Sequence, residues 1–291
     1  MIAARHAEAV MGTVVTVEVR AGARRRQLLA TESEATAQSA IDQVIAWMHW
    51  VDATFSTYKP ESEISRLERG DLTTAECHPL VREVLALCDR LRAETGGYFD
   101  ARAGGHLDPS GVVKGWSVER ASTLLAAAGW ADHAIDAGGD VRLRGAAGAG
   151  RPWQVAIRHP LHLDAFCAVV GLDEGAVATS GTYERGFHVI DPHRGLPATA
   201  LAAVTVVGPE LTVTDAYATA ALAMGDDAPG WLAALADHEA LVIRTDGTGW
   251  ATPGFERYRL DRPGAATPTA GGGDRGITSR HDAVGPAPLT R

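Results

Sequence analysis

Five short, β-rich runs lie between residues 133 and 207 and are separated by turn-forming residues. Runs of this length with turn signals at their ends are typical of strands joined by tight connections. The sequence therefore predicts a mostly antiparallel sheet in this part of the chain. The five runs cover residues 139–144, 153–158, 165–172, 187–191 and 202–207.

Apolar residues spaced three or four apart predict helices on both sides of these runs. A further strand with alternating valines is expected at residues 10–20, and Asp246-Gly247 predicts a hairpin between residues 240 and 250. We therefore expect an α+β protein, a mostly antiparallel sheet flanked by helices, whose last strand ends near Leu260. The helical segments cover residues 41–51, 79–91, 118–128, 214–225 and 228–236.

The end of the chain differs in composition from the rest. Residues 263–291 are rich in Gly, Pro, Thr and Ala and contain almost no large apolar side chain. Burial therefore cannot offset the entropy of ordering them. We expect one folded domain over residues 1–262 and a disordered tail over residues 263–291.

Charge and cysteine content exclude several classes of protein. The 27 Lys and Arg residues and the 36 Asp and Glu residues give a net charge of -9, which offers no electrostatic surface for duplex nucleic acid. Cys77, Cys88 and Cys167 lack metal-binding spacing and indicate reduced thiols.

Polar residues interrupt the N-terminal segment, and no apolar run approaches the roughly 18 residues of a membrane span. A cytoplasmic location is expected.

Most common enzyme signatures are missing. The sequence contains no Walker A loop, no HExxH and no GxSxG. The glycine-rich run from Gly145 to Gly150 is followed by Arg151-Pro152 rather than by a helix, which argues against a Rossmann site. Three other segments concentrate Gly, Asp and hydroxyl residues.

The first of these segments runs from Asp108 to Gly115 and leads into a helix. Glycines ahead of a helix let backbone groups approach a ligand, the helix N-terminus favours anions, and Lys114 adds a positive charge. Spacing alone leaves an anion site and an ordinary capped turn equally open.

The second segment combines Ala178 to Tyr183 with His188 to Pro192. Hydroxyl groups, a glycine and a histidine at the end of a strand are able to line a cofactor pocket. Residues 191–195 are equally typical of an ordinary turn. Taken alone, this segment favours the turn.

The third segment is Thr214 to Ala221, where Asp215 and Thr219 stand four residues apart on one helical face. A carboxylate and a hydroxyl that point the same way form an oxygen-rich half-shell suited to Mg²⁺. The alternative is helix capping, with Thr214 as the N-cap and Asp215 in the positively charged first turn. Residue types alone favour this alternative.

Seven motifs follow one another over about residues 10–260: Met11-Gly12-Thr13, Phe55 to Tyr58 with Ser62 to Ser65, Phe99-Asp100, Asp108 to Gly115, Asp136 to Asp140, Ala178 to Gly181 with His188 to Pro192, and Asp215 to Thr219. Together they resemble the ApbE family of FAD:protein FMN transferases. Seven motifs in one order are far more specific than any one of them.

The resemblance implies Mg²⁺-dependent transfer of FMN from FAD to a Thr or Ser hydroxyl of a target flavoprotein, with release of AMP. The carbonyl of Gly111 would hold Mg²⁺ together with Asp215 and Thr219. Catalytic roles fall to Asp215, Lys114 and His188, and His188 would take the proton of the acceptor hydroxyl. Phosphoryl chemistry depends on positioning and on charge neutralisation, which Mg²⁺ and Lys114 would supply.

The same resemblance implies a set of FAD contacts from several segments. Tyr58 offers a ring face for stacking on the cofactor, and its alternative role is that of a half-buried residue in a loop ending at Pro60. The implied contacts are Met11, Tyr58, Asp108, Lys114 and His188, with the backbone around Ala103 and Gly104.

Two acidic residues and one short interval depart from the family pattern. Glu68 and Asp136 stand where the family usually has Asn, which adds negative charge near a diphosphate site. The interval between Asp100 and Asp108 is shorter than in many members. Two alternatives therefore stay open: Mg²⁺-dependent hydrolysis of FAD to FMN and AMP, and a flavin-binding protein without catalysis.

Overall fold

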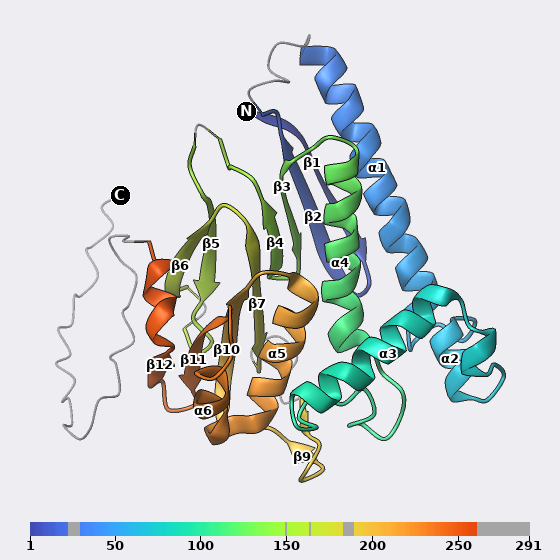
Figure 1. Cartoon of the computed structure of the whole chain (residues 1–291), viewed down its shortest axis with the longest axis vertical. Coiled ribbons are helices and arrows are strands. Elements are labelled where there is room, and N and C mark those ends of the chain that lie inside the picture. Colours follow the sequence, from blue (N-terminus) through green and yellow to red (C-terminus); the bar gives the residue numbers. More distant parts are fainter. Residues whose placement is uncertain (23–29, 149, 163, 183–188, 261–291) are drawn as a thin grey trace, which may run out of the picture.

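An eight-stranded antiparallel sheet forms the centre of the protein in the computed structural model (Figure 1). The structure describes residues 1–22, 30–148, 150–162, 164–182 and 189–260. Every neighbouring pair in this sheet is antiparallel, as predicted. In sheet order the strands are β1 (Ile2–Val10), β2 (Thr13–Arg20), β3 (Asp132–Ala137), β4 (Asp140–Arg144), β7 (Gly175–Gly181), β10 (Leu201–Gly208), β11 (Glu239–Arg244) and β12 (Gly249–Ala251).

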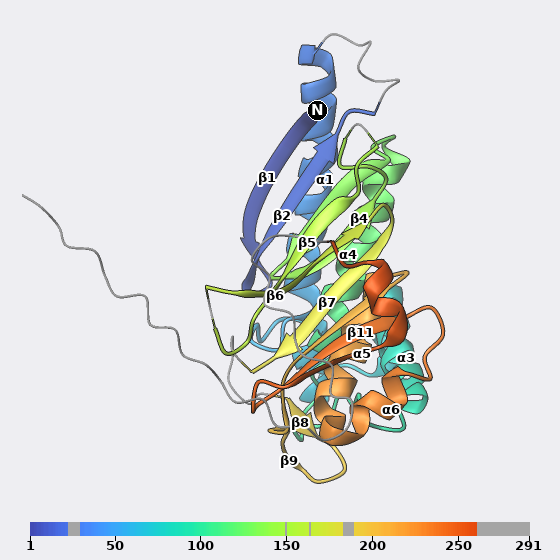
Figure 2. The same ribbon diagram turned by 90° about the vertical axis from the view of Figure 1, so that its left-hand side faces the viewer.

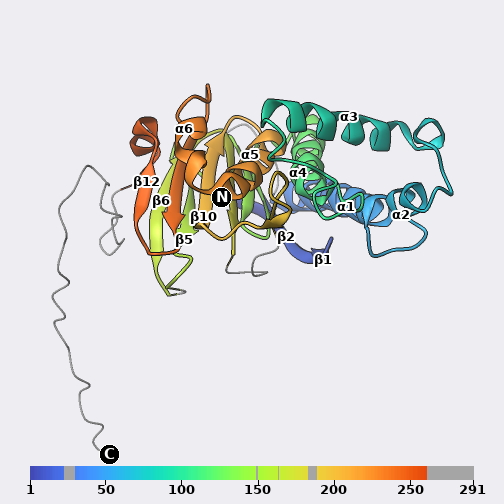
Figure 3. The same cartoon turned by 90° about the horizontal axis from the view of Figure 1, so that it is seen from below.

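Helices cover one face of this sheet, and Figure 3 shows α3, α4 and α5 on the same side of the strands. The first helix packs on β1, α4 packs on β3 and β4, and α5 packs on β7 and β10. The helices are α1 (Ala30–Phe55), α2 (Glu63–Glu68), α3 (Pro79–Glu94), α4 (Ser110–Ala127), α5 (Leu211–Met224) and α6 (Ala228–Leu232), with 3-10 turns at Thr74–Glu76, Gly225–Asp227 and Pro253–Arg257.

A hairpin of β5 (Trp153–Arg158) and β6 (Phe166–Leu172) covers part of the opposite face (Figure 2). Its side chains form a second apolar core with β4, β7, β10 and β11. Because both faces are covered there, every residue of β10 is buried. A shorter hairpin pairs β8 (Ile190–Asp191) with β9 (Leu196–Pro197).

The main core lies between the sheet and the helices. Alternate valines of β2, namely Val15, Val17 and Val19, are fully buried in this core. Each such side chain contributes about 1.5–3 kcal/mol when it is fully buried, so these valines help to hold the layer of helices on the sheet. The predicted apolar stripe of α1 is buried in the same core with Ile41, Val44, Met48 and Val51.

The N-terminal strand is part of a hairpin that the sequence pattern does not reveal. The run at residues 10–20 is its second arm, and Met11-Gly12 forms the two-residue turn with φ angles of 56° and 70°. Such turns favour Asn-Gly or Asp-Gly, so methionine at the first position gives no hairpin signal. Likewise, β3 and β7 are not among the predicted runs.

Several predicted boundaries are wrong. The helix predicted at 118–128 begins at Ser110, the helix predicted at 214 begins at Leu211, and α6 ends at Leu232. Within the described residues the last strand, β12, ends at Ala251 rather than near Leu260; a 3-10 turn starts at Pro253, and only an isolated bridge joins Arg259 to Val170.

Some sequence predictions concern residues outside the described ranges, namely residues 187 and 188 of one predicted run and the tail at 263–291. The three cysteines are buried, and none of them forms a disulfide with another described residue. Among the described residues, no helix is both long and apolar enough to cross a membrane.

Candidate metal and phosphate site

Two helices that cross closely bring several candidate residues together. A Cβ atom on Gly115 of α4 would lie 2.7 Å from the Leu211 carbonyl oxygen of α5, so only glycine permits this approach. Asp215 lies one turn further along α5 and accepts a hydrogen bond from the Gly115 backbone N–H. The crossing therefore places Asp215 beside the start of α4.

The capping interpretation of Thr214 and Asp215 is wrong. Because α5 begins at Leu211, Thr214 lies inside the first turn, where its hydroxyl donates to the Glu210 carbonyl at 2.6 Å. Asp215 is 3% exposed and lies within the helix. Its burial beside α4 is therefore not explained by capping.

Lys114 lies between two buried carboxylates. Its Nζ contacts Asp140 Oδ2 and is 3.7 Å from Asp215 Oδ1. The other oxygen of Asp140 accepts the backbone N–H of Thr179 in β7 at 2.9 Å. Two carboxylates thus share one ammonium group, which leaves an excess of negative charge that favours a cation.

One oxygen of Asp215 lacks a protein donor. Burial raises the pKa of Asp215 to about 7, Lys114 opposes this rise, and Asp140 adds to it. Its Oδ2 is buried and accepts no hydrogen bond from any residue in the described ranges. A buried carboxylate oxygen without a donor is costly, and a bound cation is the partner that its charge favours.

The remaining predicted metal ligands, Thr219 and Gly111, also present oxygen atoms. Thr219 follows Asp215 by one helical turn, and its hydroxyl is 3.0 Å from the Ser180 hydroxyl of β7. Gly111, whose carbonyl is the third predicted ligand, lies one helical turn before Gly115 on α4. Carboxylate, hydroxyl and carbonyl oxygens are the donors that Mg²⁺ prefers, so this donor set fits the ion.

Carboxylates alone do not make this site. Within the described parts of the chain, no group of three or more His, Cys, Asp or Glu side chains is placed to hold a metal ion. A cation beside Asp215 would therefore depend on hydroxyl and carbonyl oxygens, which are the ligand types predicted for Thr219 and Gly111.

The segment before α4 is a tight turn that Asp108 closes. Asp108 Oδ1 accepts the backbone N–H of Ser110 at 3.0 Å, while Pro109 occupies the N-cap position. Asp108 therefore closes a local turn, whereas the N-cap residue makes no side-chain capping hydrogen bond. The same segment leads to Lys114 and its two carboxylates, so capping does not account for all of its polar residues.

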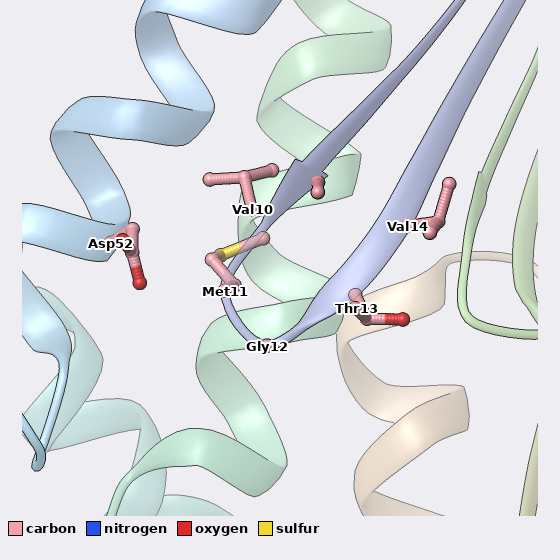
Figure 4. Close-up of a pocket in the computed structure, with 7 residues that line it drawn as sticks. Val10, Met11, Gly12, Thr13, Val14 and Asp52 are labelled. Carbon is pink, nitrogen blue, oxygen red and sulfur yellow. The ribbon is translucent and has the colours of Figure 1, made fainter.

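A shallow groove of about 610 Å³ surrounds the turn between β1 and β2. Figure 4 shows Asp52 of α1 on the same side of the turn as Met11, with Thr13 on the other side. The sulfur of Met11 lies 3.9 Å from the Ser117 hydroxyl, one turn beyond Lys114 on α4. Met11 therefore lies close to the helix that carries the charged site. The groove is lined by Ala9, Val10, Met11, Gly12, Thr13, Val14 and Asp52.

Tyr58 lies in the loop after α1 and is 95% exposed. The hydroxyl of Ser62 donates to the Ser56 carbonyl at 2.6 Å and fixes this loop. The interpretation of Tyr58 as a half-buried residue is therefore wrong. An exposed aromatic ring on a fixed loop is available for stacking against a ligand.

The two acidic departures from the family pattern have local partners. Glu68 accepts hydrogen bonds from Arg102 at 3.2 Å and from the Leu107 backbone N–H at 3.1 Å. It therefore holds the short loop that contains Ala103 and Gly104. Asp136 accepts the Gly139 backbone N–H at 2.8 Å in the turn between β3 and β4.

The charged cluster consists of Lys114, Asp140 and Asp215. Motif spacing does not single out Asp140 as a member of it. The available signal is an acid directly after the paired glycines of the Asp136 to Asp140 motif. Motif spacing does not single out Ser180 either, which lies on β7 beside the Thr219 hydroxyl. His188, predicted as a catalytic and FAD-binding residue, lies outside the described residues.

Comparisons with known proteins agree on one family. The model of the ApbE family matches residues 11–106 and 101–242. A FAD:protein FMN transferase of Rhodobacter capsulatus is 37% identical over 164 residues, which cover 53% of this chain and 31% of that protein. Another from Haemophilus influenzae is 25% identical over 291 residues, which cover 77% of this chain and 84% of that protein. The match thus spans less than a third of the first relative and most of the second.

Solved structures share the fold of this chain. The ApbE protein of Thermotoga maritima has a TM-score of 0.79 and 20% identity, and the match covers 90% of this chain and 100% of that one. The flavin transferase ApbE of Vibrio cholerae has a TM-score of 0.75 and 21% identity, covering 88% of this chain and 98% of that one. The α+β architecture is therefore common to all three.

Proposed function

The chain belongs to the ApbE family, and from this premise we propose that it is a Mg²⁺-dependent FAD:protein FMN transferase. The observation that carries the proposal is the buried Asp215 carboxylate, whose Oδ2 accepts no hydrogen bond from the described residues. It lies 3.7 Å from Lys114 and one helical turn before Thr219. A buried anionic oxygen beside a lysine suits a metal-bound diphosphate better than it suits a purely structural role.

The proposed metal ligands are Asp215, Thr219 and the carbonyl of Gly111. A bound Mg²⁺ supplies charge neutralisation at the phosphate oxygens. Asp215 of α5 and the carbonyl of Gly111 of α4 would hold the ion. Lys114 adds a second positive charge, and Asp140 keeps its ammonium near Asp215.

The proposed reaction is a substitution at phosphorus. The Thr or Ser hydroxyl of the acceptor flavoprotein forms a new bond to the phosphorus on the FMN side of FAD. The bond from this phosphorus to the bridging oxygen breaks, and AMP leaves with that oxygen. His188 takes the hydroxyl proton in this proposal, while Lys114 compensates the charge that develops on the phosphate oxygens.

Recognition of FAD is assigned to residues from several segments of the chain. The exposed ring of Tyr58 stacks on an aromatic ring of FAD, and Met11 contacts FAD from the hairpin turn beside α4. The backbone of Ala103 and Gly104 contributes from the loop that Glu68 holds, and Asp108 contributes from the turn before α4.

The decisive experiment incubates the protein with FAD, Mg²⁺ and candidate acceptor flavoproteins. Transfer raises the mass of one acceptor by one FMN and releases AMP, and the gain is lost when its acceptor Thr or Ser is replaced by Ala. Omission of Mg²⁺ and the Asp215→Asn variant serve as controls. If neither FMN nor AMP forms from FAD with any acceptor, the proposal is wrong.

The same assay separates the two alternatives. Free FMN and AMP without a change in acceptor mass would identify a FAD hydrolase, because water would then replace the acceptor hydroxyl. FAD binding without any product would identify a flavin-binding protein. Glu68 and Asp136 do not favour this last alternative, because both carboxylates are engaged by backbone donors. The cytoplasmic location stays a prediction from the sequence, for which cell fractionation is the test.

A further inference from the structure

Lys114, Asp140 and Asp215 form the charged cluster, and they lie on α4, β4 and α5. The carboxylate of Glu119 on α4 contacts both β4 and α5. Glu119 lies one helical turn after Gly115, away from Lys114 and its partners. Its Oε1 accepts a hydrogen bond from Arg142 Nε of β4 at 2.8 Å. Its Oε2 accepts the backbone N–H of Leu211, the first residue of α5, at 2.9 Å. Glu119 thus ties α4 to β4 and to α5.

The start of α5 depends on this contact. Glu210 occupies the N-cap position but makes no side-chain capping hydrogen bond. The first backbone N–H groups of a helix need acceptors, and a carboxylate is favoured there by the helix dipole. Glu119 supplies that acceptor from a different helix, so it fixes where α5 begins relative to α4.

Arg142 gives Glu119 a rigid counterpart. Arg142 is 3% exposed and also donates to the carbonyl of Gly175 at 2.9 Å. A guanidinium held from two sides cannot follow a displaced carboxylate. The contact therefore fixes β4, whose first residue is Asp140, in the same framework as the two helices.

We propose that Glu119 is a positioning residue for the metal site, because it sets the relative placement of the three elements that carry Lys114, Asp140 and Asp215. This inference rests on the proposed function of that site. The side chain touches none of these three groups in the contacts described above, so it acts only through α4, β4 and α5.

The test measures binding of Mn²⁺ alone, without FAD, to the full-length protein by electron paramagnetic resonance. Glu119→Gln removes one acceptor oxygen, and Glu119→Asp keeps the charge but shortens the reach. Both should weaken Mn²⁺ binding by about tenfold or more, as loss of a supporting group around a metal site typically does. Asp215→Asn should abolish binding and serves as the reference for loss of a ligand.

Two control variants separate positioning from general stability. Glu83→Gln removes a carboxylate of α3 that binds Arg120 and Trp116 of α4, so it disturbs α4 without touching α5 or β4. Leu125→Ala creates a cavity under α4 at a fully buried position. Both should leave Mn²⁺ affinity unchanged at temperatures where the proteins are folded.

Each outcome bears on one proposal. If the wild-type protein binds no Mn²⁺, or Asp215→Asn binds it equally well, the proposed metal site is wrong. If Asp215→Asn loses binding but the Glu119 variants match Glu83→Gln or Leu125→Ala, only the positioning role of Glu119 is wrong. If neither Glu119 variant folds by circular dichroism, Glu119 is a folding determinant, and the positioning proposal is overturned.

Discussion

Lys114 carries the positive charge at the centre of the candidate site. Its ammonium contacts Asp140 and lies 3.7 Å from Asp215, so the ionised cluster has one more negative than positive charge. A bound divalent cation would reverse this balance and make the cluster attractive to a diphosphate. Metal and diphosphate binding should therefore be coupled at this site, and substitutions within it should not be additive.

Asp215→Asn should abolish Mg²⁺-dependent turnover while the fold is retained. The variant removes the charged ligand of the proposed ion. Because a bound ion contributes several kcal/mol of charge stabilisation, the rate should fall by at least about a hundredfold. Thr219→Ala should have a smaller effect, because a neutral hydroxyl contributes less than a carboxylate. Rates at saturating FAD test both expectations, and a larger loss for Thr219→Ala would contradict the ranking.

Asp215→Asn should also change the stability of the metal-free protein in a pH-dependent way. Burial raises the folded-state pKa of Asp215 to about 7, above its ordinary value of 3.8. Its contribution to stability is therefore present at low pH and is lost as the pH rises through about 7. In EDTA at pH 8, Asp215→Asn should melt at or above the wild-type temperature. A lower melting temperature there would show that the ionised carboxylate stabilises the fold.

Tyr58→Ala should weaken FAD binding without lowering stability. The ring is 95% exposed, so the free protein loses little packing, whereas the complex loses a stacking contact of about 1 kcal/mol or somewhat more, roughly tenfold in affinity. A stacking contact acts equally in the ground and transition states, so KM should rise while kcat is kept. Flavin fluorescence titration measures the affinity, with Tyr58→Phe as the control that keeps it. An unchanged affinity would contradict the stacking role.

At the scale of elements, the crossing of α4 and α5 places the site. Gly115→Ala should push the helices apart, because its Cβ would lie 2.7 Å from the Leu211 carbonyl oxygen. The clash should exceed the gain in helix propensity and lower the free energy of unfolding by about 1–3 kcal/mol. Urea unfolding measures this change. Gly230→Ala in α6 is the control, because its Cβ would meet no atom within 4 Å, and it should be neutral or stabilising.

The residue at which a helix begins is the feature of this chain that the sequence predicts least well. The apolar spacing of α5 is visible from residue 214, yet the helix begins at Leu211 because Glu119 of another helix accepts the Leu211 N–H. A cap supplied from ninety-two positions away leaves no local signal. The hairpin turn at Met11-Gly12 is hidden for a different reason, since its φ values are set by the surrounding sheet rather than by a typical turn sequence.

At the scale of the whole molecule, the class of fold follows from apolar spacing, but the order of the strands does not. Period-two and helical patterns identify an antiparallel sheet with helices, because they report which faces are buried. They carry no information on which strands are neighbours, and β4 pairs with β7 across the β5–β6 hairpin. Asp140 joins Lys114 only through that arrangement, so its place beside Lys114 could not be predicted from spacing.

The stability of the whole domain should depend on pH through His133. This histidine is fully buried where α4 leads into β3, and Nδ1 donates to the Trp130 carbonyl at 2.6 Å. The neutral ring then accepts the Ser122 hydroxyl at Nε2, at 2.8 Å. Burial lowers the pKa of His133 to about 4, with Arg144 and Arg142 acting in the same direction.

The pKa of His133 is thus lower in the folded protein than its ordinary value of 6.5. Its contribution to stability is present above about pH 6.5 and is lost as the pH falls toward 4. Between pH 7.5 and pH 5 the loss should be about 2 kcal/mol. Burial raises the pKa values of carboxyl groups such as Asp215 and Glu210, and these groups stabilise the fold as the pH falls over this range. The pH dependence of the free energy of unfolding of the wild type therefore combines opposing contributions.

His133→Gln isolates the histidine from that sum. Its absolute stability should be lower, since the ring fills a buried site, but its free energy of unfolding should fall by about 2 kcal/mol less than that of the wild type between pH 7.5 and pH 5. Urea unfolding at the two pH values, in EDTA, measures both slopes. His193→Gln is the matched control, because that ring is exposed and its Nε2 donates to the surface carbonyl of Gly96, so it should keep the wild-type slope. Equal pH dependence in the wild type and His133→Gln would show that His133 titrates alike in the folded and unfolded chains.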